Sequence, residues 1–217
     1  MVREIREFRA EVSEEGLAKD LEKYRKMAID LGATDAKIIS ANDIIIDERV
    51  RARCFSPRCP DYGTNLNCPP HSMDLDVARR SLACFKYGIF IMLRVPPEEH
   101  AGKDYYDPSK HRIPGAIKMY EIVAKVQSET FYDGYHLAIA FGGGPSCKRA
   151  FCPKMECSGI KGEGCRFALK VTPSMHSAGM DVFTMAAKVG WNIFPIGKKV
   201  DPCQIPFGTE LGLVLVN

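Results

Sequence analysis

Seven of the nine cysteines in this chain lie in two short segments that are rich in proline or glycine. The first segment, 54–71, contains four prolines, and the second, 142–166, contains six glycines. These residues interrupt helices and strands, so both segments are predicted to be loops. A chain of 217 residues can bury a core of its own and needs no disulfide bridges to fold. Cysteines clustered on the loops of such a chain are typical of metal ligands.

The N-terminal sequence, MVREIREFRAEVSEEG, is charged where a secretory signal peptide would be apolar. The longest apolar stretch, YGIFIMLRV, has about half of the roughly 20 residues that cross a bilayer. These two features predict a cytoplasmic protein that does not enter a membrane. In that compartment thiols stay reduced, which favours metal binding over disulfide bonds.

The overall composition, 46% hydrophobic and 26% charged, is that of a soluble globular protein. The formal net charge of +3 is small, and the basic residues are dispersed among acidic ones. A nucleic-acid-binding surface would need a clustered basic face, so no nucleic-acid partner is predicted.

Hydrophobic periodicity and capping residues predict four helices and six strands. The helices are predicted over 14–32, 74–85, 114–132 and 179–189. The strands are predicted over 36–40, 44–47, 88–95, 135–141, 192–196 and 210–216. Ser13 is a suitable N-cap for the first helix and Gly32 a suitable stop, and Pro114 suits the first turn of the third helix.

The order of these elements predicts the α/β (or α+β) class, with one compact domain over 1–217. In this prediction a mixed sheet of about five to six strands is flanked by helices and carries two cysteine-rich metal-binding loops at strand ends. A hairpin turn is expected at 41–43, and a polar, mobile loop over 98–112, where residues 104–107 are solvated. The run 142–144 matches neither phosphate-binding glycine motif, so it predicts a tight exit from a strand.

The second segment spaces its four cysteines as C-x4-C-x4-C-x7-C, at Cys147, Cys152, Cys157 and Cys165. A [4Fe–4S] cluster needs four thiolates on a loop that can wrap around it, and the glycines at 159, 162 and 164 let the chain turn over the metal. Structural zinc sites usually contain C-x2-C pairs, which this segment lacks. The spacing therefore favours an iron–sulfur cluster, with zinc as the alternative.

The first segment spaces three cysteines as C-x4-C-x8-C, at Cys54, Cys59 and Cys68. Proline follows both Cys59 and Cys68, as it often follows cluster-binding cysteines in ferredoxins. Three thiolates leave one iron of a cubane without a local cysteine, so this second metal site needs another ligand or stays open. An open iron would bind a small molecule as a Lewis acid. Alternatively, the seven thiols hold one larger cluster.

Four side chains are candidates for the missing ligand of the first site: Cys84, Cys203, His71 and Asp61. Cys84 lies in the apolar run LACFKYGIF, where a buried structural thiol is expected. His71 follows the Cys-Pro-Pro turn, where a capping or surface histidine is expected. The sequence does not choose among the four.

The chain resembles a family of predicted metal-binding proteins, domain of unknown function 2284, along nearly its whole length. The family signature joins a Cys–Tyr-Gly–Cys-Pro-Pro loop to a second cysteine loop and an Arg-Pro-Ser-Met-Glu-Ala stretch. The residues that match the first loop are Cys59, Tyr62, Gly63, Cys68, Pro69 and Pro70. Those that match the second loop are Cys147, Cys152, Cys157, Cys165 and Arg166, and those of the third stretch are Pro173, Ser174, Met175, Ala178, Gly179, Asp181 and Val182.

Two residues depart from that signature. Thr172 stands where the family usually has arginine, and His176 stands where it usually has glutamate. If the glutamate contacts metal or substrate in relatives, its role is changed or lost in this chain. His176 is then either a polar group behind the metal ligands or a structural histidine.

The resemblance implies a cysteine-bound metal, and it implies no particular reaction. The first hypothesis is an electron-transfer or accessory redox protein with one or two [4Fe–4S] clusters and a redox partner protein. The second is an enzyme or a metallocofactor maturation factor with an open iron on Cys54, Cys59 and Cys68. The third is an interaction module stabilised by zinc. Whether the chain is an enzyme, and whether it forms a homo-oligomer, are left open.

Overall fold

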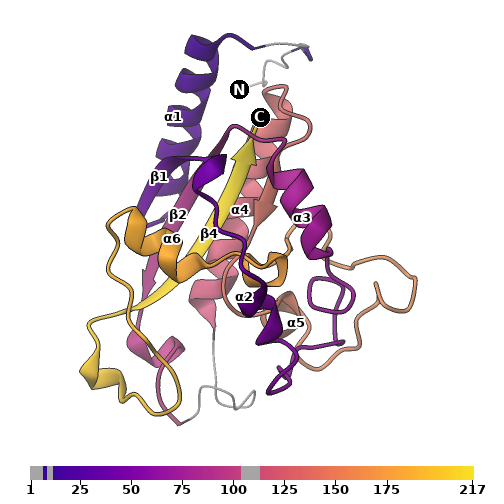
Figure 1. The fold of residues 1–217 in the computed structure, drawn as a ribbon, viewed down its shortest axis with the longest axis vertical. Helices are drawn as coiled ribbons and strands as arrows, with labels where there is room; N and C mark the ends of the chain where they lie inside the picture. The colour runs from indigo at the N-terminus through magenta and orange to yellow at the C-terminus, as the bar shows by residue number, and fades with distance from the viewer. Residues whose placement is uncertain (1–6, 9–11, 104–112) are drawn as a thin grey trace.

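Four antiparallel strands form the single sheet of this computed structural model, which describes residues 7–8, 12–103 and 113–217 (Figure 1). The strands are β1 (Asp35–Ser40), β2 (Tyr87–Val95), β3 (Ile139–Phe141) and β4 (Gly208–Val216). Their order across the sheet is β1-β2-β4-β3. The two long strands, β2 and β4, are therefore central, and β1 and β3 lie on either side of them.

The central strands are apolar on both faces because both faces of the sheet are covered. In β2, Ile89 and Ile91 point into one core while Phe90 and Met92 point into the other. This is the alternation that a strand imposes on its side chains. Strands β2 and β4 pair along their whole lengths, from Tyr87 opposite Val216 to Val95 opposite Gly208.

Two long helices, α1 (Glu14–Asp30) and α4 (Pro114–Tyr132), cover one face of the sheet. Ser13 caps α1 by accepting a hydrogen bond from the backbone N–H of Gly16. Helix α4 lies close to β4 at Gly212, where an added Cβ would be 2.6 Å from both Met119 Sδ and Val123 Cγ1. Glycine at this position thus permits the close approach of helix and sheet.

Shorter elements cover the other face: α3 (Leu75–Leu82), α6 (Val182–Lys188) and a 3-10 turn at His176–Ala178. Trp191 closes this core, with its ring 4.8 Å from that of Phe90 and its Nε1 donating to Asp35 at 2.7 Å. Two helices have five residues each: α2 (Glu48–Ala52) lies just before the first cysteine loop, and α5 (Cys147–Phe151) lies within the second, which is therefore not a loop throughout. Further 3-10 turns are found at Ala41–Asp43, Pro97–Glu99 and Pro202–Gln204.

The helix predictions agree with the structure best where the periodicity is longest. The prediction over 114–132 is confirmed by α4, and that over 14–32 by α1, which ends two residues earlier. The prediction over 74–85 corresponds to the shorter α3, with Asp74 as its cap. The prediction over 179–189 begins too early, because Gly179 has a left-handed φ of 79° and α6 starts at Val182.

The sheet differs from its prediction in two respects: it has four strands instead of five to six, and it is antiparallel, not mixed. Residues 41–43 form a 3-10 turn capped by Ser40, so no hairpin forms, and Ile46 makes a single bridge to Met180. Residues 192–196 are not a strand, and Phe194 instead packs on Phe207. The strand predicted over 135–141 begins at 139, because Ala138 N–H closes a turn onto the carbonyl of Tyr135.

Part of the loop predicted over 98–112 falls on residues 104–112, outside the described residues, and so does the solvated segment 104–107. Within the described part of the chain, no helix combines the length and apolar character needed to cross a membrane.

Candidate metal centre

The two cysteine loops lie beside each other at one end of the sheet (Figure 1). The second loop is closed at its base, because Gly142 N–H donates to the carbonyl of Pro173 at 2.9 Å and Gly142 forms a bridge with Ser174. The chain thus leaves β3 and returns to nearly the same point after the four cysteines. This closure confines the loop to one region of the molecule.

The glycine run at the start of this loop fits against buried side chains. Gly144 N–H donates to Glu210 Oε2 at 2.9 Å, and a Cβ on Gly143 would be 2.3 Å from the same oxygen. A Cβ on Gly142 would be 2.6 Å from the ring of Tyr120. The run is therefore a tight strand exit, as the sequence predicts, and a side chain at Gly142 or Gly143 would displace its neighbours.

Cys147 is the first residue of α5, and two neighbours fix the start of that helix. Ser146 caps it by accepting from the backbone N–H of Arg149 at 3.3 Å. The hydroxyl of buried Tyr120 donates to the carbonyl of Pro145 at 3.1 Å. These contacts set the direction in which the Cys147 thiol leaves the helix.

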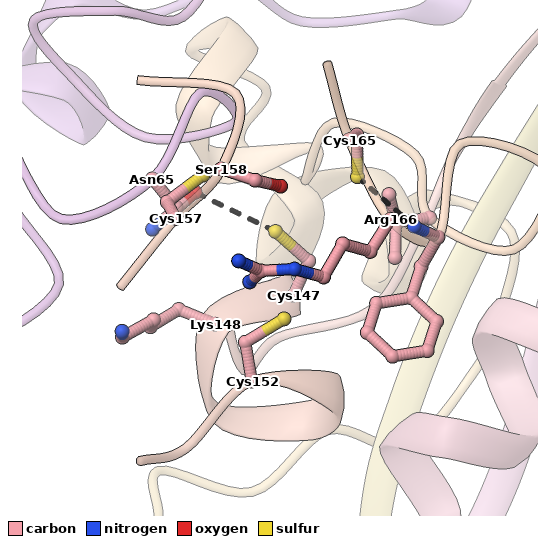
Figure 2. Close-up of a pocket in the computed structure, with 10 residues that line it drawn as sticks. Asn65, Cys147, Lys148, Cys152, Cys157, Ser158, Cys165 and Arg166 are labelled. Carbon is pink, nitrogen blue, oxygen red and sulfur yellow. Dashed lines mark hydrogen bonds between the residues drawn. The ribbon is translucent and has the colours of Figure 1, made fainter. Parts of the chain in front are cut away.

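The four thiols of the second segment line one cavity (Figure 2). Figure 2 shows Cys147 at the centre, with Cys157 and Ser158 on one side, Cys165 on another and Cys152 below. The Cys147 thiol interacts electrostatically with each of the other three. The cavity lining is completed by Asn65, Lys148, Ser158, Arg166, Phe167 and Val171. The structure therefore brings together the four residues that the sequence proposes as one ligand set.

These thiols differ in how readily they ionise. Burial raises the pKa of the Cys147 thiol to about 11 and also raises the pKa of Cys152. Burial pushes the pKa of Cys157 upward too, but the backbone N–H groups of Ile160, Leu66 and Gly159 outweigh it, so that pKa lies below its usual value. Hydrogen bonds to a thiolate favour the charged form that a metal requires.

The three cysteines of the first segment form a second, adjoining group. Cys54, Cys59 and Cys68 are half-buried, and Cys59 N–H donates to the carbonyl of Cys54 at 3.1 Å. The Cys59 thiol interacts electrostatically with both Cys54 and Cys68. Burial raises the pKa of Cys68 to about 12, and the nearby Cys147 thiol adds to this rise. The two groups of thiols therefore meet at Cys68 and Cys147.

The structure separates the four candidates for a further ligand. Cys84 is exposed, not buried as expected, because it follows the end of α3, where its thiol donates to the carbonyl of Arg80 at 3.3 Å. Cys203 is exposed and has Asp201 as its partner, and His71 is also exposed. Asp61 is half-buried, hydrogen-bonds to Ser146 and interacts with the Cys68 thiol. Asp61 is therefore the candidate that lies against the thiols.

Thr172 and His176, singled out from the sequence, follow the second loop in the chain. Thr172 is buried next to Gly142, where an added Cβ would be 2.8 Å from its hydroxyl oxygen. The ring of His176 lies 6.2 Å from that of Phe183, and its buried Nε2 has no hydrogen-bond partner among the described residues. Neither side chain lines the thiol cavity.

In the described part of the chain, no three Cys, His, Asp or Glu side chains converge on a point that would hold a single metal ion. A tetrahedral zinc ion requires such convergence, with sulfurs about 2.3 Å from one centre. A cubane binds each thiolate through a different iron, so its ligands are spread around a larger body. The four thiols line one cavity, and they do not meet at a single point within the described residues.

Sequence reasoning did not identify Asn65, Leu66 and Asn67 as part of this site. Asn67 Nδ2 donates to Cys147 Sγ at 3.3 Å, and Cys147 Sγ lies 3.6 Å from Asn65 Oδ1 as a donor to it. These residues belong to the first loop but contact a ligand of the second. The sequence signal was the pair of asparagines close to Cys68, which alone indicates only a loop.

A family model described as "Predicted metal-binding protein (DUF2284)" matches residues 37–210. This range contains both cysteine loops in full. No curated protein and no solved structure matches the chain.

Proposed function

The chain belongs to the DUF2284 family of predicted metal-binding proteins, and we propose that the metal it binds is iron, in an iron–sulfur cluster. The ligands of that cluster would be Cys147, Cys152, Cys157 and Cys165. The observation that carries this proposal is the single cavity that the four thiols line. Their spacing in the sequence, which contains no C-x2-C pair, favours a cluster over zinc.

Residues of the chain supply what such a cluster needs. Ile160, Leu66 and Gly159 donate backbone hydrogen bonds to Cys157, which stabilise a thiolate. Lys148 and Arg166 line the cavity, where their positive charges offset those of thiolates. A bound [4Fe–4S] cluster supplies one-electron redox chemistry, so the proposed role is electron transfer or an accessory redox function.

The first group of thiols supports a second metal site on Cys54, Cys59 and Cys68. Three thiols and one adjacent carboxyl group, Asp61, would leave an iron open to exchange or weakly bound. This arrangement supports a second candidate function, that of an enzyme or maturation factor in which an open iron binds sulfur, a metal or a small molecule. A purely structural zinc site is the remaining alternative.

The surface around the second loop favours an acidic protein as the redox partner. Leu169 is 95% exposed and Ile160 40%. The exposed basic side chains over residues 154–170 are Lys154, Lys161, Arg166 and Lys170. Two exposed acidic residues, Glu156 and Glu163, lie among them, and Glu156 pairs with Lys161. Exposed apolar side chains in a stretch with an excess of basic over acidic residues are suited to a transient complex with a negatively charged surface.

Anaerobic purification tests the metal directly. The expected protein is brown, contains iron and acid-labile sulfide in similar amounts, and has an absorbance band at about 400 nm that dithionite bleaches. Colourless protein that contains zinc and no iron would contradict the cluster. EPR spectra of the reduced protein with and without added thiolate or cyanide then test the open iron, since an unchanged spectrum argues against it.

A cysteine substitution tests the ligand set. Cys157→Ala removes one of the four proposed ligands and is expected to lose about half of the bound iron if two sites exist and are independent. Cys84→Ala is the matched control, because that thiol is exposed and bonded to its own helix. Full iron content in Cys157→Ala would remove Cys157 from the ligands.

A further inference from the structure

We propose that the first cysteine loop completes the metal centre of the second, by donating hydrogen bonds from Asn67 and Leu66 to Cys147 and Cys157. These donors would set the reduction potential of the cluster on the second loop. The inference rests on the proposed function, since it concerns the cluster that those cysteines hold. It assigns a role to Asn67 and Leu66, which are not metal ligands, and it makes the cluster on the second loop depend on the first loop.

The Asn67 side chain is positioned by hydrogen bonds within its own loop. Asn65 is 1% exposed, and its Oδ1 accepts the backbone N–H of Asn67 at 3.0 Å. Asn65 Nδ2 donates to Thr64 Oγ1 at 3.2 Å, and Thr64 donates to the carbonyl of Asp61 at 2.8 Å. This chain of bonds holds the segment in a compact turn from which Asn67 Nδ2 reaches Cys147 Sγ.

Leu66, between the two asparagines, contacts the second loop at another ligand. Its backbone N–H donates to Cys157. Its side chain packs on Gly159, where an added Cβ would be 2.3 Å from Leu66 Cδ1. Figure 2 shows Asn65 beside Cys157 and Ser158, on the side of the cavity that the first loop forms. Residues 65–67 thus contact two of the four proposed ligands, Cys147 and Cys157.

N–H donors to thiolate sulfur stabilise the more negative, reduced form of a cluster and raise its potential. Such a hydrogen bond is stronger in the reduced cluster than in the oxidised one, and this difference is what shifts the potential. Loss of the Asn67 donor is therefore expected to lower the equilibrium constant for reduction of the cluster about tenfold.

The same segment joins the two groups of thiols. Cys68 follows Asn67 directly, and the Asn65 side chain lies against both groups of thiols, because it hydrogen-bonds to Cys68 and its Oδ1 is 3.6 Å from Cys147 Sγ. A metal on Cys68 would therefore fix the residues that contact the second cluster. Filling the first site is expected to change the potential of the second, and the effect is reciprocal.

The test is Asn67→Leu, which removes the donor at similar volume, measured in the whole chain after anaerobic purification. Iron and sulfide are counted first, and the potential is then measured by titration monitored by EPR. The expected result is full iron content and a potential lowered by about 59 mV, the equivalent of a tenfold change for one electron. Asn42→Leu, on an exposed 3-10 turn remote in sequence, is the control.

Two further variants, Asn67→Asp and Asn67→Gln, test whether the N–H donor itself causes the change in potential. Asn67→Asp keeps the shape and replaces the donor with an acceptor, so its potential is expected to fall further, while Asn67→Gln retains an amide and is expected to recover part of the shift. Selective loss of iron from the second site in Asn67→Leu, with the fold intact by circular dichroism, also supports the proposal.

Full iron content with unchanged potentials in Asn67→Leu and Asn67→Asp would overturn the inference and leave the cluster itself in place. Wild-type protein without iron or sulfide would instead overturn the proposed function. Cys68→Ser provides a separate measurement of coupling between the sites. Its second cluster is expected to shift in potential, and an unshifted potential would contradict that coupling.

Discussion

At the residue scale, His176 has a buried ring nitrogen without a hydrogen-bond partner among the described residues. Burial lowers the pKa of His176, and the neighbouring Arg53 contributes to the decrease. The folded protein therefore resists protonation of this ring at pH values where the unfolded chain accepts a proton. Stability contributed by the neutral ring is present above the unfolded pKa of about 6.5 and declines as pH falls below it.

The corresponding prediction compares His176→Gln with the wild type in urea unfolding between pH 8 and about pH 5. The wild-type midpoint is expected to fall as the pH decreases, and the variant is expected to show a weaker decrease. His71→Gln, in which an exposed histidine is replaced, serves as the control and should follow the wild type. Equal pH dependence in all three proteins would show that His176 is not the responsible group.

Side-chain chemistry determined how much of the site the sequence could reveal. Thiols are metal ligands by their own nature, so spacing alone identified Cys147, Cys152, Cys157 and Cys165 as one set. The function of an asparagine side chain depends instead on which group it contacts in the folded protein. Asn67 contacts a thiol 80 positions away in sequence, and no local pattern indicates that contact.

At the element scale, the contact between α4 and β4 depends on Gly212. Gly212→Ala would place a Cβ 2.6 Å from Val123 Cγ1, and that branched side chain has little freedom to move. Overpacking of this kind typically costs about 1–3 kcal/mol, so the free energy of unfolding of the variant is expected to be lower by that amount. The variant should therefore unfold at a lower urea concentration than the wild type. The measurement is equilibrium unfolding followed by circular dichroism.

Gly197→Ala is the matched control for this experiment, because nothing lies within 4 Å of a Cβ at that position. Its free energy of unfolding is expected to stay within about 0.5 kcal/mol of the wild type. If Gly212→Ala were equally stable, the helix would have room to shift, and the close contact would not limit residue size.

Long elements were predictable because their pattern repeats over several turns, as in α1 and α4. Shorter apolar runs were predicted with mixed success, since burial alone does not distinguish a strand from a packed loop. The runs predicted over 36–40, 88–95 and 210–216 form β1, β2 and β4, whereas those over 44–47 and 192–196 form no strand. Ile44 and Ile46 at 44–47 pack against the core without a partner strand, as does Ile193 at 192–196. Strand pairing depends on distant segments, so the antiparallel order of the sheet could not be derived from local sequence.

At the scale of the whole molecule, the charge around the second loop leads to a prediction about kinetics. Electron exchange with a small acidic carrier such as flavodoxin is expected to slow steeply as salt rises, because charge steers the encounter. Lys154→Glu with Lys170→Glu should slow the exchange at low salt by about tenfold or more. Stopped-flow absorbance at several ionic strengths measures these rates.

Lys19→Glu with Lys26→Glu, on the exposed side of α1, is the control for this experiment. Its rates are expected to remain close to those of the wild type. Rates that do not depend on salt, or that change equally in both double variants, would exclude this surface as the place where an acidic carrier binds.

The short strand β3 affects how copies of this protein can associate. β3 pairs with β4 over only three positions, and directly after it Gly142 bridges to Ser174 of the same chain. The backbone groups on that flank are thus partly occupied by the protein's own returning segment. Growth of the sheet into a continuous ribbon across molecules is disfavoured there, as it is at blunted edges of other β proteins. Self-association on this side would have to proceed through side-chain contacts.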